Sequence, residues 1–210
     1  MIKGVLFDFD GVLIDSKQST IAYFQETFRH FKIPVPREED FENILGLRTI
    51  DMLKKLLPHL SDGELAPIFD YNRKMSIKYV SKITLTPNAI EALTLLKGKY
   101  ALGLITSRSK QGVKMLFDMY KLDRFFPVVL DREDVSHHKP HPEGIETAMR
   151  ILHLKSNEVV YIGDTKEDIE AAHNANIICV YISNHSNDFN ADYKISKIEE
   201  LPGLLKKIEG

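Results

Sequence analysis

Short apolar runs recur along the chain, and in its second half they alternate with segments of helical periodicity. A run that is apolar on both faces is typical of a strand buried inside a parallel sheet, because helices cover both sides of such a sheet. Strands that alternate with helices indicate βαβ units. The sequence therefore predicts an α/β protein with a doubly wound parallel sheet, whose strands are Gly4–Phe9, Ala101–Thr106, Pro127–Leu130, Glu158–Ile162 and Ile177–Ile182.

The segment between the first two predicted strands is too long for a single crossover. It contains about ninety residues, far more than one crossover helix requires. The segment is helical in pattern almost throughout, and one apolar stripe is formed by Ile21, Phe24, Phe28 and Phe31. We interpret residues 16–82 as a helical cap domain inserted into a core formed by residues 1–15 and 83–210. We expect this domain to act as a lid over the end of the first strand.

Several helix boundaries carry recognisable signals. Thr86 followed by Pro87 predicts the start of a helix, and Gly98 predicts its end. Two pairs of residues have the spacing of a capping box, in which a polar side chain at the helix start pairs with one three residues later. These pairs are Asp15 with Gln18 and Ser61 with Glu64.

Composition narrows the class of protein. The chain has 210 residues, of which 43% are hydrophobic and 28% charged, as is ordinary for a globular protein. Its net charge of −2 argues against a nucleic-acid partner, since such proteins usually carry a basic excess. We expect no membrane span, because no apolar stretch is long enough, and no signal peptide, because one lysine is followed directly by a predicted strand. The single cysteine, Cys179, excludes a disulfide framework, and we expect a cytoplasmic location.

Two carboxylates lie at the end of the first predicted strand, in the stretch "GVLFDFDGV". Burial of one unpaired carboxylate costs several kcal/mol, so a run of strand residues that ends in Asp8 and Asp10 is unusual. One interpretation is that the strand stops at Phe7 and both aspartates lie in a solvated turn. The other is a ligand site at the carboxyl end of a central strand, which is where open α/β sheets bind ligands.

Polar side chains also follow the other predicted strands. Thr106 and Ser107 come after the second strand, in a turn whose hydroxyl and amide groups are suited to phosphate oxygens. Lys139 has rigid, proline-bounded neighbours in "HHKPHP", and Asp164 and Asp168 follow a later strand in "GDTKED". Each signal has an ordinary alternative: the lysine could be solvated, and the two aspartates could cap a helix.

Together these residues predict a site for phosphoryl transfer. Asp8, Asp10 and Asp164 would repel one another if they converged, unless a cation lay between them. Mg²⁺ suits such a site because it binds carboxylate oxygens, waters and substrate phosphate. Lys139 would keep Asp8 ionised, and a carboxylate that faces a positioned phosphoryl group is a nucleophile.

The order "DFDGV", "LITS", the lysine of "HHKPHP" and "GDTKED" resembles the haloacid dehalogenase superfamily, in particular its phosphoglycolate phosphatase and β-phosphoglucomutase-like branch. The resemblance covers the whole chain. It implies a Rossmann-like core with an inserted helical cap. It also implies a Mg²⁺-dependent phosphatase that hydrolyses a small phosphorylated metabolite through an aspartyl phosphate.

The resemblance also implies a role for each residue of the site. Asp8 would be the nucleophile, and Asp10 the general acid for the leaving group and then the base for water. The phosphate would be held by Thr106, Ser107 and Lys139, the last of which would bridge it to Asp8. Mg²⁺ would be bound by Asp8, the backbone carbonyl of Asp10 and Asp164, with Asp168 in contact with the ion or supporting it indirectly.

Two arginines are further candidates for substrate recognition. Arg48 in "LGLRT" lies between two predicted cap helices, where relatives place a specificity loop, although a solvated arginine would look the same. Arg108 directly follows the phosphate turn and could contact a substrate carboxylate or phosphate, or simply begin a helix. The histidines of "HHKPHP" are not expected to bind a transition metal, because they lie in a loop with no matching run of ligands; they are His137, His138 and His141.

Two other functions remain open at this point. A sugar-phosphate mutase would share the site, but β-phosphoglucomutases carry a cap histidine where this chain has Thr20. A phospho-accepting receiver-like signalling domain would pair an aspartate with Thr or Ser and Lys, but lacks a counterpart of Asp10 and a cap. Asp10 also disfavours dehalogenases and phosphonatases, which lack it. We expect a small phosphorylated metabolite as the partner, and a monomer or small homo-oligomer.

Overall fold

The computed structural model describes residues 1–42, 44–184 and 189–209, and the chain forms two compact units. One unit contains Met1–Ile14 and Leu85–Gly210, and the other contains Asp15–Thr84. The chain passes between the units twice, at β2 (Ile14–Asp15) and β3 (Thr84–Leu85), and these two short strands pair with each other. No helix in the described part of the chain is both long and apolar enough to cross a membrane.

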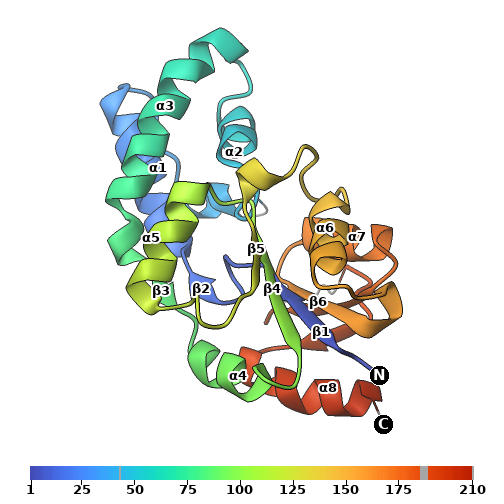
Figure 1. Cartoon of the computed structure of the whole chain (residues 1–210). Helices are drawn as coiled ribbons and strands as arrows, with labels where there is room; N and C mark the ends of the chain where they lie inside the picture. Colours follow the sequence, from blue (N-terminus) through green and yellow to red (C-terminus); the bar gives the residue numbers. More distant parts are fainter. Residues whose placement is uncertain (43, 185–188, 210) are drawn as a thin grey trace. The chain divides into compact units, whose positions relative to one another are not determined.

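A six-stranded sheet forms the centre of the first unit (Figure 1). Its order is β5-β4-β1-β6-β7-β8, and every neighbouring pair is parallel. The strands are β1 (Gly4–Phe7), β4 (Ala101–Ile105), β5 (Val128–Leu130), β6 (Val159–Gly163), β7 (Ile178–Ile182) and β8 (Tyr193–Ile195). Phe7 lies opposite Leu104 on one side and Ile162 on the other. The predicted α/β fold with a doubly wound parallel sheet is confirmed, and β1, β4 and β6 end at the same edge.

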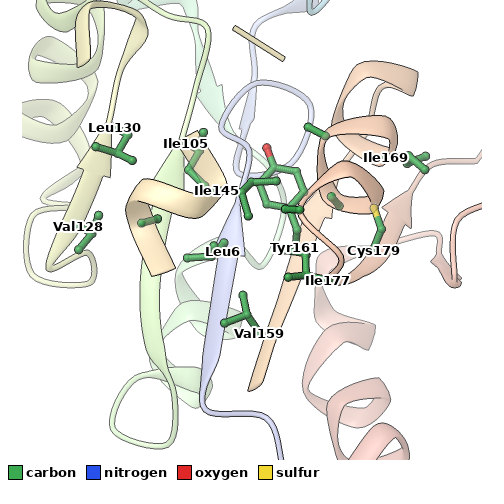
Figure 2. Close-up of a cluster of buried hydrophobic side chains, with 14 of the residues drawn as sticks. Leu6, Ile105, Val128, Leu130, Ile145, Val159, Tyr161, Ile169, Ile177 and Cys179 are labelled. Atoms are coloured by element: carbon green, nitrogen blue, oxygen red, sulfur yellow. The ribbon is translucent and has the colours of Figure 1, made fainter. Parts of the chain in front are cut away.

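Alternate side chains of the sheet enter two apolar layers. Leu6, Val159 and Tyr161 belong to a buried cluster that also contains residues of the helices α6 and α7, such as Ile145 and Ile169 (Figure 2). On the other side of β1, Phe7 meets Phe126 edge to face, with ring centroids 6.0 Å apart. The helices of this unit are α4 (Ala89–Leu96), α5 (Lys110–Tyr120), α6 (Glu143–Ile151), α7 (Lys166–Asn174) and α8 (Leu201–Glu209).

The second unit is helical and has its own apolar core. Its helices are α1 (Lys17–His30), α2 (Thr49–Leu56) and α3 (Asp62–Lys78), with the 3-10 turns Glu38–Phe41 and Val80–Lys82. The stripe of α1 contributes Ile21, Phe24 and Phe28 to a cluster with residues of the other helices, among them Leu53 and Leu65. The capping box of Ser61 and Glu64 forms as predicted, with both reciprocal hydrogen bonds.

Other local predictions were wrong. The first strand ends at Phe7, because the chain turns after Asp8, so the two aspartates lie beyond the ladder of β1 and β4. Asp15 and Gln18 form no capping box; Ser16 precedes α1, and the Gln18 amide donates to Glu38 instead. The helix expected at Thr86 and Pro87 begins at Ala89, after Asn88 in the left-handed conformation with φ 61°.

Candidate active site

The carboxyl edge of the sheet brings together side chains from three strand ends. The amide of Asp8 donates to the carbonyl of Ile162 at 2.8 Å, which keeps the chain beside β6 for one residue past β1. Asp164 directly follows Gly163, the last residue of β6. Asp8, Asp164 and Asp168 each offer a carboxylate oxygen within 4.8 Å of the others. The convergence follows from the parallel register, because strands that run side by side end side by side.

Lys139 joins two of these carboxylates. Its ammonium nitrogen lies 2.7 Å from Oδ1 of Asp8 and 2.5 Å from Oδ1 of Asp168. The lysine side chain is 10% exposed, so the pairs are shielded from solvent. Burial disfavours the charge of Lys139, but Asp168 and Asp8 outweigh it and hold the pKa of the ammonium well above its usual value. Lys139 is therefore a fixed positive charge beside Asp8.

All the acceptor positions of Asp168 are occupied by donors of the protein. Oδ1 accepts from Lys139 and, at 2.9 Å, from the hydroxyl of Tyr161. Oδ2 accepts from the amide and the hydroxyl of Thr165, at 3.1 Å and 2.6 Å. Two carboxylate oxygens have about four lone-pair sites between them, so these four bonds saturate the group. This arrangement supports an indirect role for Asp168, as the anchor of Lys139 and the capping residue of α7.

Asp164 has the opposite environment. Its Oδ1 is out of contact with solvent, and no hydrogen-bond partner for it exists among the described residues. Burial, together with the charges of Asp8 and Asp168, raises the pKa of Asp164 well above its usual value. Gly11 has φ +77°, and a Cβ there would lie 1.8 Å from Oδ2 of Asp164. The glycine therefore lets the backbone approach the carboxylate where a side chain would displace it.

The donor set fits a hard divalent cation. Burial raises the pKa of Asp8 to about 7, against the opposing effect of Lys139, and the unpartnered oxygen of Asp164 lies in the same cluster. A buried, unsatisfied carboxylate oxygen is costly in a folded protein unless a cation or donor satisfies it. Oxygen ligands of this kind are those that Mg²⁺ prefers. Asp8 and Asp164 are thus the side chains suited to hold such an ion.

The residues expected to hold phosphate lie close to Lys139. Thr106, Ser107 and Lys139 line one pocket of the first unit, together with residues of the loop before α6. The hydroxyl of Thr106 accepts the amide of Arg108 at 3.1 Å, which fixes the turn after β4. A turn of this type presents amide and hydroxyl donors to an anion.

Asp10 pairs with Arg108, a contact that the sequence did not indicate. Nε of Arg108 donates to Oδ2 of Asp10 at 3.0 Å, and Nη2 contacts Oδ1. The side chain of Asp10 is 24% exposed and that of Arg108 is 16% exposed.

Arg48 belongs to the second unit, where it precedes α2 and donates to both oxygens of Asp51, at 2.6 Å and 3.0 Å.

Tyr161 is a polar residue of the cluster that the sequence reasoning missed. Its ring is fully buried among apolar side chains, and its hydroxyl points away from Val159 and Ile177 (Figure 2). The hydroxyl donates to Asp168 and lies 3.3 Å from the nitrogen of Lys139. The signal in the sequence was a tyrosine in the aliphatic strand "VVYIG", because a buried hydroxyl needs a partner.

The comparisons with known proteins agree with this architecture. A family model described as haloacid dehalogenase-like hydrolase matches residues 5–182. The chain belongs to this family of hydrolases. It is 30% identical over 215 residues to a protein named pyrophosphatase PpaX from Listeria monocytogenes serotype 4b, and the match covers 99% of this chain and 98% of the relative. A pyrophosphatase PpaX from Bacillus mycoides is 29% identical, with 100% and 99% covered.

Solved structures show the same fold. A putative haloacid dehalogenase-like hydrolase from Bacteroides fragilis superposes with a TM-score of 0.90 at 24% identity, covering 96% of this chain and 100% of that one. A β-phosphoglucomutase from Clostridium difficile has a TM-score of 0.86 at 19% identity, covering 100% and 98%. The Rossmann-like core expected from the resemblance is confirmed.

Proposed function

We propose that this hydrolase is a Mg²⁺-dependent phosphatase that acts on a small phosphorylated metabolite through an aspartyl phosphate. The proposal rests on two neighbouring carboxylates, one of which has a cationic partner while the other has an oxygen without a hydrogen bond from the described residues. Asp8 is buried and held by Lys139 at 2.7 Å, and beside it Asp164 presents an oxygen that the described residues leave without a hydrogen bond. A carboxylate fixed by a cation is a suitable nucleophile, and a second carboxylate that lacks a donor is a suitable metal ligand.

In the first half of the reaction a carboxylate oxygen of Asp8 forms a bond to phosphorus, and the bond from phosphorus to the leaving oxygen breaks. Asp10 gives its proton to the leaving oxygen. Lys139 holds Asp8 in place and neutralises charge on the phosphoryl oxygens, while Thr106 and Ser107 hold those oxygens through hydroxyl and amide groups.

In the second half the aspartyl phosphate is hydrolysed. Asp10 takes a proton from water, the water oxygen bonds to phosphorus, and the bond to Asp8 breaks, which restores the carboxylate and releases phosphate. Arg108 contacts both oxygens of Asp10, so it fixes the orientation in which this carboxylate gives and takes the two protons.

Asp8, Asp164 and the backbone carbonyl of Asp10 would hold Mg²⁺. The bound ion would supply positive charge against the transferring phosphoryl group. Asp168 is assigned to Lys139 rather than to the ion, because its four acceptor positions are already occupied.

Relatives suggest one substrate for the first assays. Two similar proteins are named pyrophosphatase, so inorganic pyrophosphate belongs beside sugar phosphates and phosphoglycolate in a substrate panel. The similarity to a β-phosphoglucomutase is at 19% identity and concerns the fold, so it adds nothing in favour of a mutase.

The test is phosphate release from this panel and from p-nitrophenyl phosphate, with Mg²⁺ or with a chelator. We expect turnover with Mg²⁺, none with the chelator, and full recovery when Mg²⁺ is added back. Asp164→Asn should abolish turnover, whereas Asp123→Asn, at an exposed position, should leave it unchanged. Full turnover in the chelator, or in Asp164→Asn, would overturn the proposal.

A further inference from the structure

The loop that carries Lys139 also carries a cluster of metal-ligating side chains outside the acidic site. His137, His141 and Glu143 each offer one donor atom within 4.8 Å of the other two. The imidazole rings of the two histidines are stacked, with centroids 4.5 Å apart and an interplanar angle of 28°. Nδ1 of His137 lies 2.8 Å from Oε2 of Glu143. The sequence does not indicate the third ligand, Glu143, because this residue begins α6 and does not belong to a second run of histidines.

Glu143 is already held in the position of a ligand. Its two carboxylate oxygens accept the backbone amides of Ser136 and His137, each at 2.8 Å. These bonds and the ring of His137 lower the pKa of Glu143 to about 2, so the group is ionised. Hydrogen bonds that orient a ligand in this way raise metal affinity, because the carboxylate loses little freedom when the ion binds.

We propose that His137, His141 and Glu143 form a binding site for a divalent transition-metal ion such as Zn²⁺. Two imidazoles and one carboxylate are a donor set that zinc uses, with a fourth position left for water. Imidazole favours zinc, copper and nickel, whereas Mg²⁺ favours oxygen donors alone. The histidine site and the carboxylates of Asp8 and Asp164 therefore select different cations.

The cluster needs only local adjustment to bind such an ion. Ligands at about 2.0–2.2 Å from a tetrahedral ion lie roughly 3.3 Å apart. The contact of 2.8 Å between His137 and Glu143 would therefore widen slightly as the ion replaces the shared proton. Nδ1 of His141 accepts the amide of Glu143 at 3.2 Å, so an ion at that nitrogen would replace this hydrogen bond. The side chain of His137 is 67% exposed, so it is free to rotate at little cost in packing.

A bound ion would act on the loop that positions Lys139. His137 and His141 lie two residues before and two residues after this lysine. An ion that binds both histidines would connect the two sides of the turn and tie them to the start of α6. Because Lys139 contacts Asp8 and Asp168, occupancy of the histidine site would restrict the segment that holds the reacting carboxylate.

The test is titration of the untagged protein with Zn²⁺ by calorimetry, in the presence of excess Mg²⁺ to occupy the acidic site. We expect one equivalent of Zn²⁺ to bind to the wild type and to Asp164→Asn. His137→Ala and His141→Ala should weaken this binding by at least about 10–100-fold, the loss that even an outer partner of a metal ligand produces. His59→Ala removes an exposed histidine of the second unit and should bind as the wild type does.

Two further readouts separate this site from the proposed reaction. Zn²⁺ should raise the thermal midpoint of the wild type but not that of His141→Ala, since an ion that binds only the folded state stabilises it. Untagged wild type should be retained on immobilised Ni²⁺, and His141→Ala should not. Equal binding by the wild type and His141→Ala, or loss of the Zn²⁺ equivalent in Asp164→Asn instead, would overturn the proposal. None of these measurements depends on phosphatase turnover.

Discussion

Arg108 and Asp10 lie 98 residues apart in the sequence and form a two-point ion pair, in which Nε and Nη2 of the arginine contact one oxygen each of the aspartate. An arginine fork fixes both the position and the plane of a carboxylate. The pair is less than a quarter exposed on either side, so solvent weakens it only in part. The carboxylate proposed to move protons is thus held in a defined orientation by a residue of the neighbouring turn.

The first prediction concerns this arginine. Arg108→Ala should lower kcat about 10-fold or more, because general base help of about 10²–10⁴-fold depends on a well-placed carboxylate. The kcat of Arg108→Lys should lie between that of the wild type and that of Arg108→Ala, because lysine keeps the positive charge but cannot make the two-point contact. Rapid-quench kinetics should show more phosphorylated enzyme at steady state in Arg108→Ala than in the wild type. Arg132→Ala, which removes an arginine paired with Glu133, is the control. An unchanged phosphorylated fraction would contradict a positioning role.

The second prediction separates the two opening aspartates. Asp8→Asn should form no covalent intermediate and show no turnover. Asp10→Asn should release one equivalent of phenolate from an aryl phosphate and then stall, because a good leaving group needs little acid but hydrolysis of the aspartyl phosphate needs a base. Intact-protein mass spectrometry should detect the phosphoryl group on Asp10→Asn. If this variant folds, binds Mg²⁺ and yet gives neither burst nor adduct, Asp10 does not act in the second half-reaction.

The third prediction tests the support of Lys139 by Tyr161. Tyr161→Phe keeps the ring in the buried cluster and removes the hydroxyl that contacts Asp168 and Lys139. We expect kcat to fall about 10-fold with KM nearly unchanged. The free energy of unfolding should fall by about 1–3 kcal/mol, because the hydroxyl makes two hydrogen bonds. Tyr100→Phe, which loses a bond to Glu209 beyond the opposite end of β4, should keep wild-type kcat. A rise in KM alone would argue against a role in placing the nucleophile.

The fourth prediction uses two glycines with the same backbone requirement. Gly11 and Gly98 have φ +77° and +87°, so alanine at either should cost about 1–2 kcal/mol of unfolding free energy. Only at Gly11 would the new methyl meet the carboxylate of Asp164; at Gly98 nothing lies within 4 Å. Calorimetry should therefore find weaker Mg²⁺ binding in Gly11→Ala, by at least about 10-fold, and unchanged binding in Gly98→Ala. Equal Mg²⁺ affinity in the two variants would mean that Asp164 is not a ligand.

The sheet, and the edge of it that carries the aspartates, could be predicted from the sequence because both depend on simple patterns of apolar residues and strand ends. A strand buried on two faces needs apolar residues throughout, and parallel strands must end together. β8 escaped prediction because two of its three residues, Tyr193 and Lys194, are exposed, so the edge strand has no apolar run. The start of α4 was misplaced because the left-handed turn at Asn88 delays the helix by two residues after Thr86 and Pro87.

The different environments of Asp164 and Asp168 could not be predicted from the sequence. Asp164 and Asp168 are both aspartates of "GDTKED", and only the structure shows that one is saturated by donors and the other is not. That difference depends on side-chain positions from three separate segments, including a tyrosine and a lysine 22 residues apart. The pairing of Asp10 with Arg108 is of the same kind, since a long-range ion pair leaves no periodic signal.

In the first unit, the point where the chain leaves lies beside the point where it returns. The amide of Thr86 donates to the carbonyl of Leu13 at 3.0 Å, just where the chain leaves this unit and where it returns. A turn of a few residues would therefore be enough to close the gap without altering the order of the strands. The segment between Leu13 and Thr86 is therefore a topological insertion, whose length could change without any change in the strand order of the sheet.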